Sequence, residues 1–337
     1  MSKGMVLVTG ASGYIAGFII KQLVDDGWTV RGTIRDLKKA DAVRRSLDMP
    51  GLELFAADLS SDAGWEEALA GCDHVQHIAS PIPEREPKDE QELIKPAREG
   101  ALRVLAAAKG AKVKRVVMTS SMAAIAYGHP EPRPVFTEAN WTDPTDPDTY
   151  AYIRSKTYAE RAARDWMAQY GIGMEFVTVN PSAVLGPVLG GDFSPSLLVV
   201  KKLLDGALPG LPRLGFAIVD VRDVADLHIR AMTAPGIDND RFIAAGKFMW
   251  MRDIAEVLKY RLGDRAKRVP TRSLPDWLLR IAARFDPTVR MVVPELGKVR
   301  ACSSAHAKDA LGWVPRDEAE TIVDCAESLL AHGLVKV

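Results

Sequence analysis

Hydrophobic positions in the first 180 residues follow two patterns that alternate along the chain. Short runs rich in apolar and β-branched residues occupy 6–8, 28–34, 52–57, 73–79, 113–119 and 174–180. In stretches such as 89–109 and 152–170, apolar residues instead recur every three or four positions. The runs predict buried β-strands, and the longer stretches predict amphipathic helices. Their alternation predicts an α/β fold with a doubly wound parallel sheet.

The pattern changes after residue 180. Prolines and glycines cluster between 186 and 212, and the apolar stretches become shorter and less regular. A chain of 337 residues fits one large unit or two fused units. We therefore expect a first domain over 1–180, with a return segment near 216–233. A smaller C-terminal unit, mainly 181–337, is expected to cover the open edge of the sheet.

The amino-acid composition argues against several kinds of binding partner. The chain has 44 basic and 44 acidic residues, so no global field attracts nucleic acid or a membrane surface. No apolar run approaches the ~20 residues needed to span a bilayer, and no signal peptide precedes the first strand. The three cysteines are widely spaced and predict neither disulfides nor a metal site. These features predict a soluble, cytoplasmic protein.

Glycines follow the first strand immediately and precede the first helix. Gly10 allows a sharp turn, and Gly13 allows backbone N–H groups to approach an anion closely. The helix that begins here directs its partial positive charge at the same point, which suits a pyrophosphate. An ordinary glycine-rich turn in a β-α unit is the alternative reading, because such a motif alone is weak.

The end of the second strand bears on the choice of dinucleotide. In a dinucleotide-binding fold this position lies beside the adenosine ribose, where an acidic residue favours NAD and an arginine accommodates the 2′-phosphate of NADP. The chain has Arg35 there, followed by Lys38 and Lys39. Positive charge predicts NADP(H), although Asp36 could hold a ribose hydroxyl and NAD stays an alternative.

Tyr152 and Lys156 are four residues apart, so on a helix they share one face. We expect the ammonium to lower the pKa of the phenol, which could then exchange a proton with a carbonyl or alcohol. Ser120 and Ser121 end the preceding strand, and a serine hydroxyl there could hydrogen-bond the substrate oxygen. The alternative is a surface helix that happens to contain this pair.

Taken together, these motifs resemble those of extended short-chain dehydrogenases/reductases, which have a Rossmann fold. Closer still is the likeness to the dihydroflavonol-4-reductase and cinnamoyl-CoA reductase group, with its microbial aldehyde and ketone reductases. The motifs are Thr9-Gly10-x-x-Gly13, 30–36, Asp58-Leu59, 77–81, 94–100, 113–121, Tyr152-x-x-x-Lys156, Asn180-Pro181-x-x-Val184-x-Gly186-Pro187, 219–225 and Leu311-Gly312-Trp313.

The resemblance implies roles for individual residues. The implied catalytic set is Ser121, Tyr152 and Lys156, and the last two also contact the cofactor. Ser120 replaces Ser121 if the alignment slips by one residue. The implied cofactor contacts are Gly10, Ser12, Gly13, Tyr14 and Ile15 at the pyrophosphate, Arg35 at the 2′-phosphate, Asp58 and Leu59 at the adenine, Ala79 and Ser80 at the nicotinamide-side ribose, and Pro181, Ala183 and Val184 at the nicotinamide.

Three departures from the group's pattern qualify the resemblance. Ala16 replaces the third loop glycine, a position that accepts alanine because it packs helix on strand. Ala101 and Arg103 replace a usual threonine and asparagine. Ala126 stands where plant flavonoid reductases carry an asparagine that holds ring hydroxyls, so a less hydroxylated aromatic or aliphatic carbonyl compound is the expected substrate.

The function implied is an NADPH-dependent reductase that transfers hydride to an aldehyde or ketone, reversible to alcohol oxidation. Its expected partner is a small-molecule carbonyl or alcohol; oligomeric state is open, with a homodimer one option. An NAD-dependent sugar-nucleotide epimerase or dehydratase is the alternative, with Lys201, Lys202 and Arg213 as contacts for a diphosphate. A third reading is a cofactor-sensing regulator that uses the fold without catalysis.

Overall fold

A seven-stranded parallel sheet forms the centre of the larger part of the molecule. The computed structural model describes residues 2–81, 87–130, 135–190 and 194–336. The strand order is β3-β2-β1-β4-β5-β6-β9, and every pair in it is parallel. The strands are β1 (Met5–Val8), β2 (Thr29–Ile34), β3 (Glu53–Ala56), β4 (His74–His77), β5 (Arg115–Thr119), β6 (Glu175–Pro181) and β9 (Arg241–Ala244). The predicted doubly wound α/β fold is confirmed.

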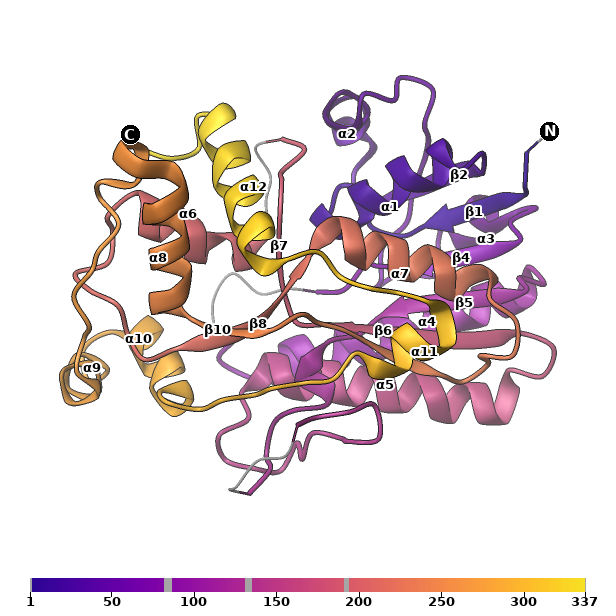
Figure 1. Cartoon of the computed structure of the whole chain (residues 1–337). Helices are drawn as coiled ribbons and strands as arrows, with labels where there is room; N and C mark the ends of the chain where they lie inside the picture. Colours follow the sequence, from indigo (N-terminus) through magenta and orange to yellow (C-terminus); the bar gives the residue numbers. More distant parts are fainter. Residues whose placement is uncertain (1, 82–86, 131–134, 191–193, 337) are drawn as a thin grey trace.

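Helices cover both faces of this sheet, and Figure 1 shows them above and below the strands. On one face, α1 (Tyr14–Asp25) and α7 (Val221–Thr233) bury apolar side chains against the strands. The opposite face is covered by α4 (Gln91–Gly110) and α5 (Ala151–Tyr170). Two shorter helices complete this part of the chain, α2 (Ala40–Leu47) and α3 (Trp65–Leu69). Because the strands are parallel, the carboxyl ends of β1, β4, β5 and β6 and the loops that follow them lie at the same edge of the sheet.

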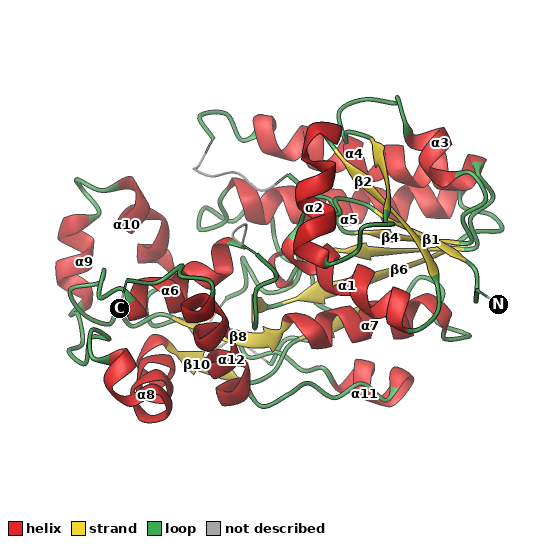
Figure 2. Cartoon of the chain, turned by 90° about the horizontal axis from the view of Figure 1, so that it is seen from above, coloured by secondary structure: helices red, strands yellow, loops and turns green. Residues whose placement is uncertain are grey.

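A smaller sheet lies beside the large one, with strand order β10-β8-β7. Its strands are β7 (Ala183–Leu185), β8 (Gly215–Asp220) and β10 (Phe248–Trp250). A second apolar core joins it to α6 (Leu198–Leu204), α8 (Met251–Leu262) and α12 (Glu318–Ala331). Figure 2 shows this assembly as a separate lobe at one end of the large sheet.

The remaining elements are short. They are the α-helices α9 (Asp276–Ala282), α10 (Pro287–Val292) and α11 (Ala305–Leu311), and the 3-10 helices η1 (Leu37–Lys39), η2 (Met122–Ala124), η3 (Pro195–Leu197), η4 (Gly263–Ala266) and η5 (Val293–Glu295). None of the helices described is long and apolar enough to cross a membrane.

Residues beyond the predicted return segment near 216–233 also contribute to the large sheet. Within that segment, α7 packs on α1, but β8 belongs to the small sheet. The strand that the later part of the chain adds to the large sheet, next to β6, is β9, which begins eight residues beyond the predicted end. The division into units 1–180 and 181–337 stays a prediction.

Candidate active site

The glycine turn after β1 leaves the N-terminus of α1 open. Gly10 has φ +70°, and a Cβ there would lie 3.1 Å from the Cβ of Ala79, so the turn requires glycine. Gly13 is the N-cap of α1, and no side chain caps the helix. The first N–H groups of a helix have no intrahelical acceptor. This turn therefore fits the pyrophosphate of a dinucleotide.

The Thr9 side chain joins this turn to the segment after β4. Its Oγ1 accepts the N–H groups of Ile78 at 3.0 Å and Ala79 at 2.9 Å. It also lies 3.0 Å from Nδ1 of His77. Because the oxygen already accepts twice, its own proton is donated to His77. Thr9 thus fixes the start of the segment that contains Ala79 and Ser80, the two residues predicted to contact the nicotinamide-side ribose, against the glycine turn.

Arg35 and Asp58 lie near each other after the ends of β2 and β3. Arg35 is exposed. Hydrogen bonds from Ser60 are the main cause that lowers the pKa of Asp58, and the Arg35 charge also contributes. Oδ1 of Asp36 accepts the Lys38 N–H at 2.9 Å, so this carboxylate caps η1. The structure thus brings together the residues predicted at the 2′-phosphate and the adenine.

Ser121, Tyr152 and Lys156 meet where β5 ends against α5. The Ser121 hydroxyl lies close enough to the Tyr152 phenol to lower its pKa. Ser121 is also the N-cap of η2, because its Oγ accepts the Ala123 N–H at 3.1 Å. Nζ of Lys156 lies 5.9 Å from the centroid of the Tyr152 ring. Lys156 is buried, whereas Tyr152 stays partly accessible.

Burial dominates the titration of this cluster. It raises the pKa of Tyr152 above its ordinary value, and the Ser121 hydrogen bond offsets only part of this. Burial also lowers the pKa of Lys156 to about 8, although the Glu160 carboxylate opposes the shift. The prediction of a lowered phenol pKa is therefore wrong here, because desolvation disfavours the phenolate and the ammonium alike. The phenol is protonated at neutral pH, as a proton donor must be.

The two neighbouring serines have different partners. The Ser120 hydroxyl donates to Oε2 of Glu160 at 2.5 Å, and Ser120 is buried. Ser121 is the serine that acts on the pKa of the Tyr152 phenol. This geometry favours Ser121 over Ser120 as the serine that could contact a substrate oxygen.

The predicted nicotinamide contacts lie at the end of β6 and in β7. Pro181 ends β6, and Ala183 and Val184 begin β7. Preceding them, Asn180 donates from Nδ2 to the Ser121 carbonyl oxygen at 3.2 Å. This bond places the chain around Pro181 next to the chain around Ser121.

The Tyr14 hydroxyl is buried with no hydrogen-bond partner in the described part of the chain. Burial, followed by the charges of Cys325 and Asp220, raises the pKa of Tyr14 well above its ordinary value. These neighbours lie in α12 and before α7, so the hydroxyl points into the protein. Of the predicted pyrophosphate contacts, Tyr14 could therefore contribute its backbone but not its hydroxyl.

Tyr14→Phe is therefore expected to keep or raise the free energy of unfolding, by up to about 1 kcal/mol, because it removes an unpaired buried hydroxyl. Urea unfolding measures the change, and NADPH affinity should stay at its wild-type value. Tyr260→Phe is the control, since Tyr260 is 89% exposed. A loss of more than about 1 kcal/mol in Tyr14→Phe alone would show that the hydroxyl has a partner.

Buried polar groups that contact the predicted catalytic set were not among the residues predicted from the sequence. Glu160 lies one turn beyond Lys156 on α5 and contacts Ser120, Asn180 and Arg241. The available signal was the repeated spacing of four from Tyr152 to Lys156 to Glu160. Tyr127 was also missed: burial raises its pKa to about 12, and Tyr152 is among the groups that act on it.

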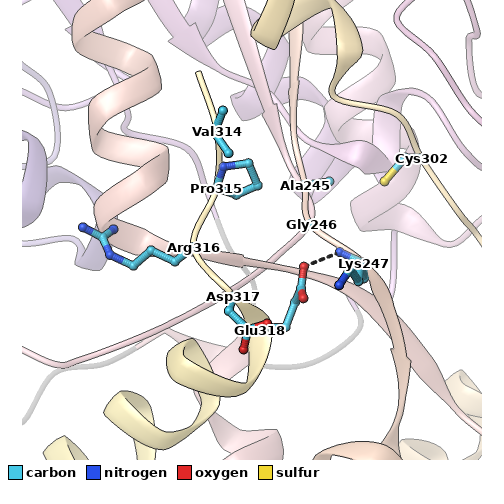
Figure 3. Close-up of a pocket in the computed structure, with 9 residues that line it drawn as sticks. All are labelled: Ala245, Gly246, Lys247, Cys302, Val314, Pro315, Arg316, Asp317 and Glu318. Atoms are coloured by element: carbon cyan, nitrogen blue, oxygen red, sulfur yellow. Dashed lines mark hydrogen bonds between the residues drawn. The ribbon is translucent and has the colours of Figure 1, made fainter. Parts of the chain in front are cut away.

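A hollow of about 380 Å³ elsewhere on the surface contains none of the predicted site residues (Figure 3). Its lining is Ala245, Gly246, Lys247, Cys302, Val314, Pro315, Arg316, Asp317 and Glu318. The Glu318 carboxylate accepts the Lys247 N–H at 2.6 Å, and Arg316 pairs with Asp223. Two of its charged groups therefore serve to hold the start of α12 in place.

An open glycine turn and a Tyr-Lys pair beside a serine, on a parallel sheet, define an extended short-chain dehydrogenase/reductase. The family model described as the NAD dependent epimerase/dehydratase family matches residues 6–244. The chain belongs to this family, and the predicted membership is confirmed.

Individual relatives are reductases. The chain is 39% identical over 238 residues to cinnamoyl-CoA reductase CAD2 of Medicago truncatula, covering 67% of this chain and 72% of that protein. It is 37% identical over 279 residues to cinnamoyl-CoA reductase 1 of Arabidopsis thaliana, covering 80% and 76%. The solved structure of yeast methylglyoxal/isovaleraldehyde reductase Gre2 complexed with NADPH is similar, with a TM-score of 0.82, 25% identity, and coverage of 98% of this chain and 100% of that chain. The prediction of an oxidoreductase is confirmed.

Proposed function

We propose that this protein is an NADPH-dependent reductase of a small aldehyde or ketone, with Ser121, Tyr152 and Lys156 as its catalytic residues. The observation that carries the proposal is the placement of Ser121 beside a protonated Tyr152, with Lys156 on the next helical turn. Named relatives that reduce carbonyl compounds support it, including one solved with NADPH.

The protein's part in the reaction is proton transfer and charge stabilisation. The bound cofactor supplies the hydride that reaches the carbonyl carbon. Tyr152 donates its proton to the carbonyl oxygen, while the Ser121 hydroxyl hydrogen-bonds that oxygen as negative charge develops. Lys156 stabilises the phenolate that remains. The same groups run alcohol oxidation in reverse, with the phenolate as the base.

The residues around the strand ends would hold the cofactor in an extended arrangement. The open N-terminus of α1 would take the pyrophosphate, with Arg35 at the 2′-phosphate and Asp58 and Leu59 at the adenine. Ala79 and Ser80 would contact the nicotinamide-side ribose together with Lys156. The nicotinamide itself would be bordered by Pro181, Ala183 and Val184.

Arg35→Ser tests the cofactor assignment. We expect KM for NADPH to rise about ten- to a hundredfold and KM for NADH to change little, because a hydrogen bond to a charged group is worth about 1.5–3 kcal/mol. Initial rates with each cofactor measure this. Arg45→Ser is the control, because Arg45 is exposed on α2 and carries the same charge. Equal changes for NADPH and NADH would contradict a role at the 2′-phosphate.

The epimerase or dehydratase alternative has less support. Lys201 donates from Nζ to Asp205 at 2.7 Å and to the Leu334 carbonyl oxygen at 2.5 Å. Arg213 pairs with Asp276 at 2.7 Å. Two of the three cations considered for a diphosphate are thus committed to protein partners.

A panel of carbonyl compounds assayed by loss of NADPH absorbance tests the function directly. Ala126 offers no polar side chain that could hydrogen-bond ring hydroxyls. We therefore expect the enzyme to reduce aldehydes and ketones that lack several such hydroxyls. Purified protein that carries NAD and consumes no added NADPH would overturn the proposal in favour of the epimerase alternative.

A cytoplasmic location and a homodimer belong to the same proposal. Free cysteines at 72, 302 and 325 suit a reducing compartment. Sedimentation of the purified protein measures the oligomeric state.

A further inference from the structure

Glu160 is a buried carboxylate that the proposed reaction does not use. It lies four residues after Lys156, so Tyr152, Lys156 and Glu160 occupy successive turns on one face of α5. Its side chain is 0% exposed. An isolated charge is costly to bury, so its partners must stabilise it.

Five residues donate hydrogen bonds to the Glu160 carboxylate, among them Thr178, whose Oγ1 donates to Oε1 at 3.2 Å. Oε2 accepts from Oγ of Ser120 at 2.5 Å and from Nδ2 of Asn180 at 2.8 Å. Oε1 accepts from Nε of Arg241 at 2.7 Å and from Nε of Arg164 at 3.3 Å. Burial alone would raise the pKa of Glu160, but the two arginine charges hold it below its ordinary value. The group is therefore an anion at neutral pH.

These partners connect Glu160 to the reacting groups. Ser120 directly precedes Ser121, and Asn180 also donates from Nδ2 to the Ser121 carbonyl oxygen at 3.2 Å. The carboxylate thus ties α5, which carries Tyr152, to the ends of β5 and β6. A change in these Glu160 contacts would move the Ser121 hydroxyl relative to the Tyr152 phenol.

Glu160 also supplies the negative charge that faces Lys156. On the same helix Lys156 faces Tyr152, whose phenol is neutral, and at the end of β4 it faces His77. Burial lowers the pKa of His77 to about 3, so this ring is neutral as well. Arg241 on β9 and Arg164 on α5 contribute positive charge behind the carboxylate. Without Glu160, no negative charge would oppose the effect of burial on the pKa of Lys156.

We propose that Glu160 is a positioning residue that keeps Lys156 in its ammonium form and fixes Ser121 against Tyr152. This inference rests on the proposed function. It gives Ser120 a different task from Ser121, namely to hold the carboxylate.

Glu160→Gln is the test, since it removes the charge and keeps the shape. The alkaline limb of the pH profile of kcat/KM should move to lower pH by about one unit, because an opposite charge nearby favours the ammonium by about that much or more. KM for the carbonyl substrate should change little. A second readout needs no turnover: the pH at which NADPH affinity falls, measured by fluorescence titration, should move by the same amount.

Glu175→Gln is the matched control. Glu175 pairs with Arg115, whose side chain is 5% exposed, at 2.7 Å from Nε. It lies five residues before Asn180 on β6, about 16 Å away along the strand. Both variants deprive a buried arginine of an anion, so both should lose stability. Only Glu160→Gln should shift the two pH profiles.

An unchanged alkaline limb in Glu160→Gln, or an equal shift in Glu175→Gln, would overturn the inference. Should Glu160→Gln fail to fold, the charge-balanced Glu160→Gln/Arg241→Gln variant replaces it, with a shift in the same direction expected. Failure of the proposed function shows differently: Tyr152→Phe would then retain full activity. An inactive Tyr152→Phe together with a wild-type limb in Glu160→Gln would overturn this inference alone.

Discussion

Tyr152→Phe is expected to lower kcat for carbonyl reduction by about 10²–10⁴-fold, the range for loss of a positioned proton donor. The variant keeps the ring and removes only the hydroxyl that Ser121 contacts. Because burial raises the pKa of Tyr152, the wild-type phenol is protonated through neutral pH. Wild-type reduction should therefore be sustained at neutral pH and fall at alkaline pH, whereas alcohol oxidation should rise with pH.

NADPH absorbance measures turnover, and fluorescence titration measures cofactor binding in the same variant. Binding should survive in Tyr152→Phe, because the proposed pyrophosphate and 2′-phosphate contacts are untouched. Tyr158→Phe, on the same helix and partly exposed, should behave as wild type. A Tyr152→Phe enzyme with wild-type turnover would rule out the phenol as proton donor and favour a different use of the fold.

The first six strands were predictable because each is a short run rich in apolar or β-branched residues that lies between helical stretches. In a parallel sheet both faces are covered, so such strands are rich in apolar residues, as Val116 and Val117 in β5 illustrate. The seventh strand, β9, begins with Arg241 and lies in the part of the chain where the apolar pattern is less regular. Its membership depends on pairing with β6, a long-range contact that no local pattern encodes.

The candidate site was predictable where its geometry is local. The spacing of Tyr152 and Lys156 requires only a helix, and the open turn at Gly10 and Gly13 requires only a β-α junction. The direction of the Tyr152 pKa shift was not predictable, because it depends on how much protein covers the phenol. The choice between Ser120 and Ser121 likewise depends on Glu160, which approaches from another element.

Two buried histidines, His77 and His228, form hydrogen bonds with polar side chains in or next to the large sheet. Nδ1 of His228 lies 2.8 Å from Oε1 of Gln76, and its Nε2 lies 3.0 Å from Oγ1 of Thr119. Gln76 donates from Nε2 to the His228 carbonyl oxygen at 3.1 Å, which orients the amide and makes Nδ1 the donor. In His77, Nδ1 instead accepts the Thr9 proton. Burial lowers the pKa of each ring to about 3, so both are neutral at neutral pH.

Acidification should consequently destabilise the fold well before its carboxylates titrate. Each histidine has an ordinary pKa of 6.5, so below that pH the unfolded chain binds up to two protons more than the folded chain. Their contribution is fully present above pH 6.5 and is lost as the pH falls towards 3. Between about pH 7.5 and 5 the loss is about 2 kcal/mol for each histidine, or about 4 kcal/mol together.

Urea unfolding at intervals across this range measures the loss, and its slope against pH counts the protons. His77→Gln and His228→Gln should each reduce the slope by about one proton, because glutamine can hydrogen-bond but does not titrate. His332→Gln is the control, since His332 is exposed on the C-cap of α12 and should leave the slope unchanged. Equal free energies of unfolding at neutral and acidic pH would mean that both rings accept a proton without unfolding, contrary to the effect of burial on their pKa.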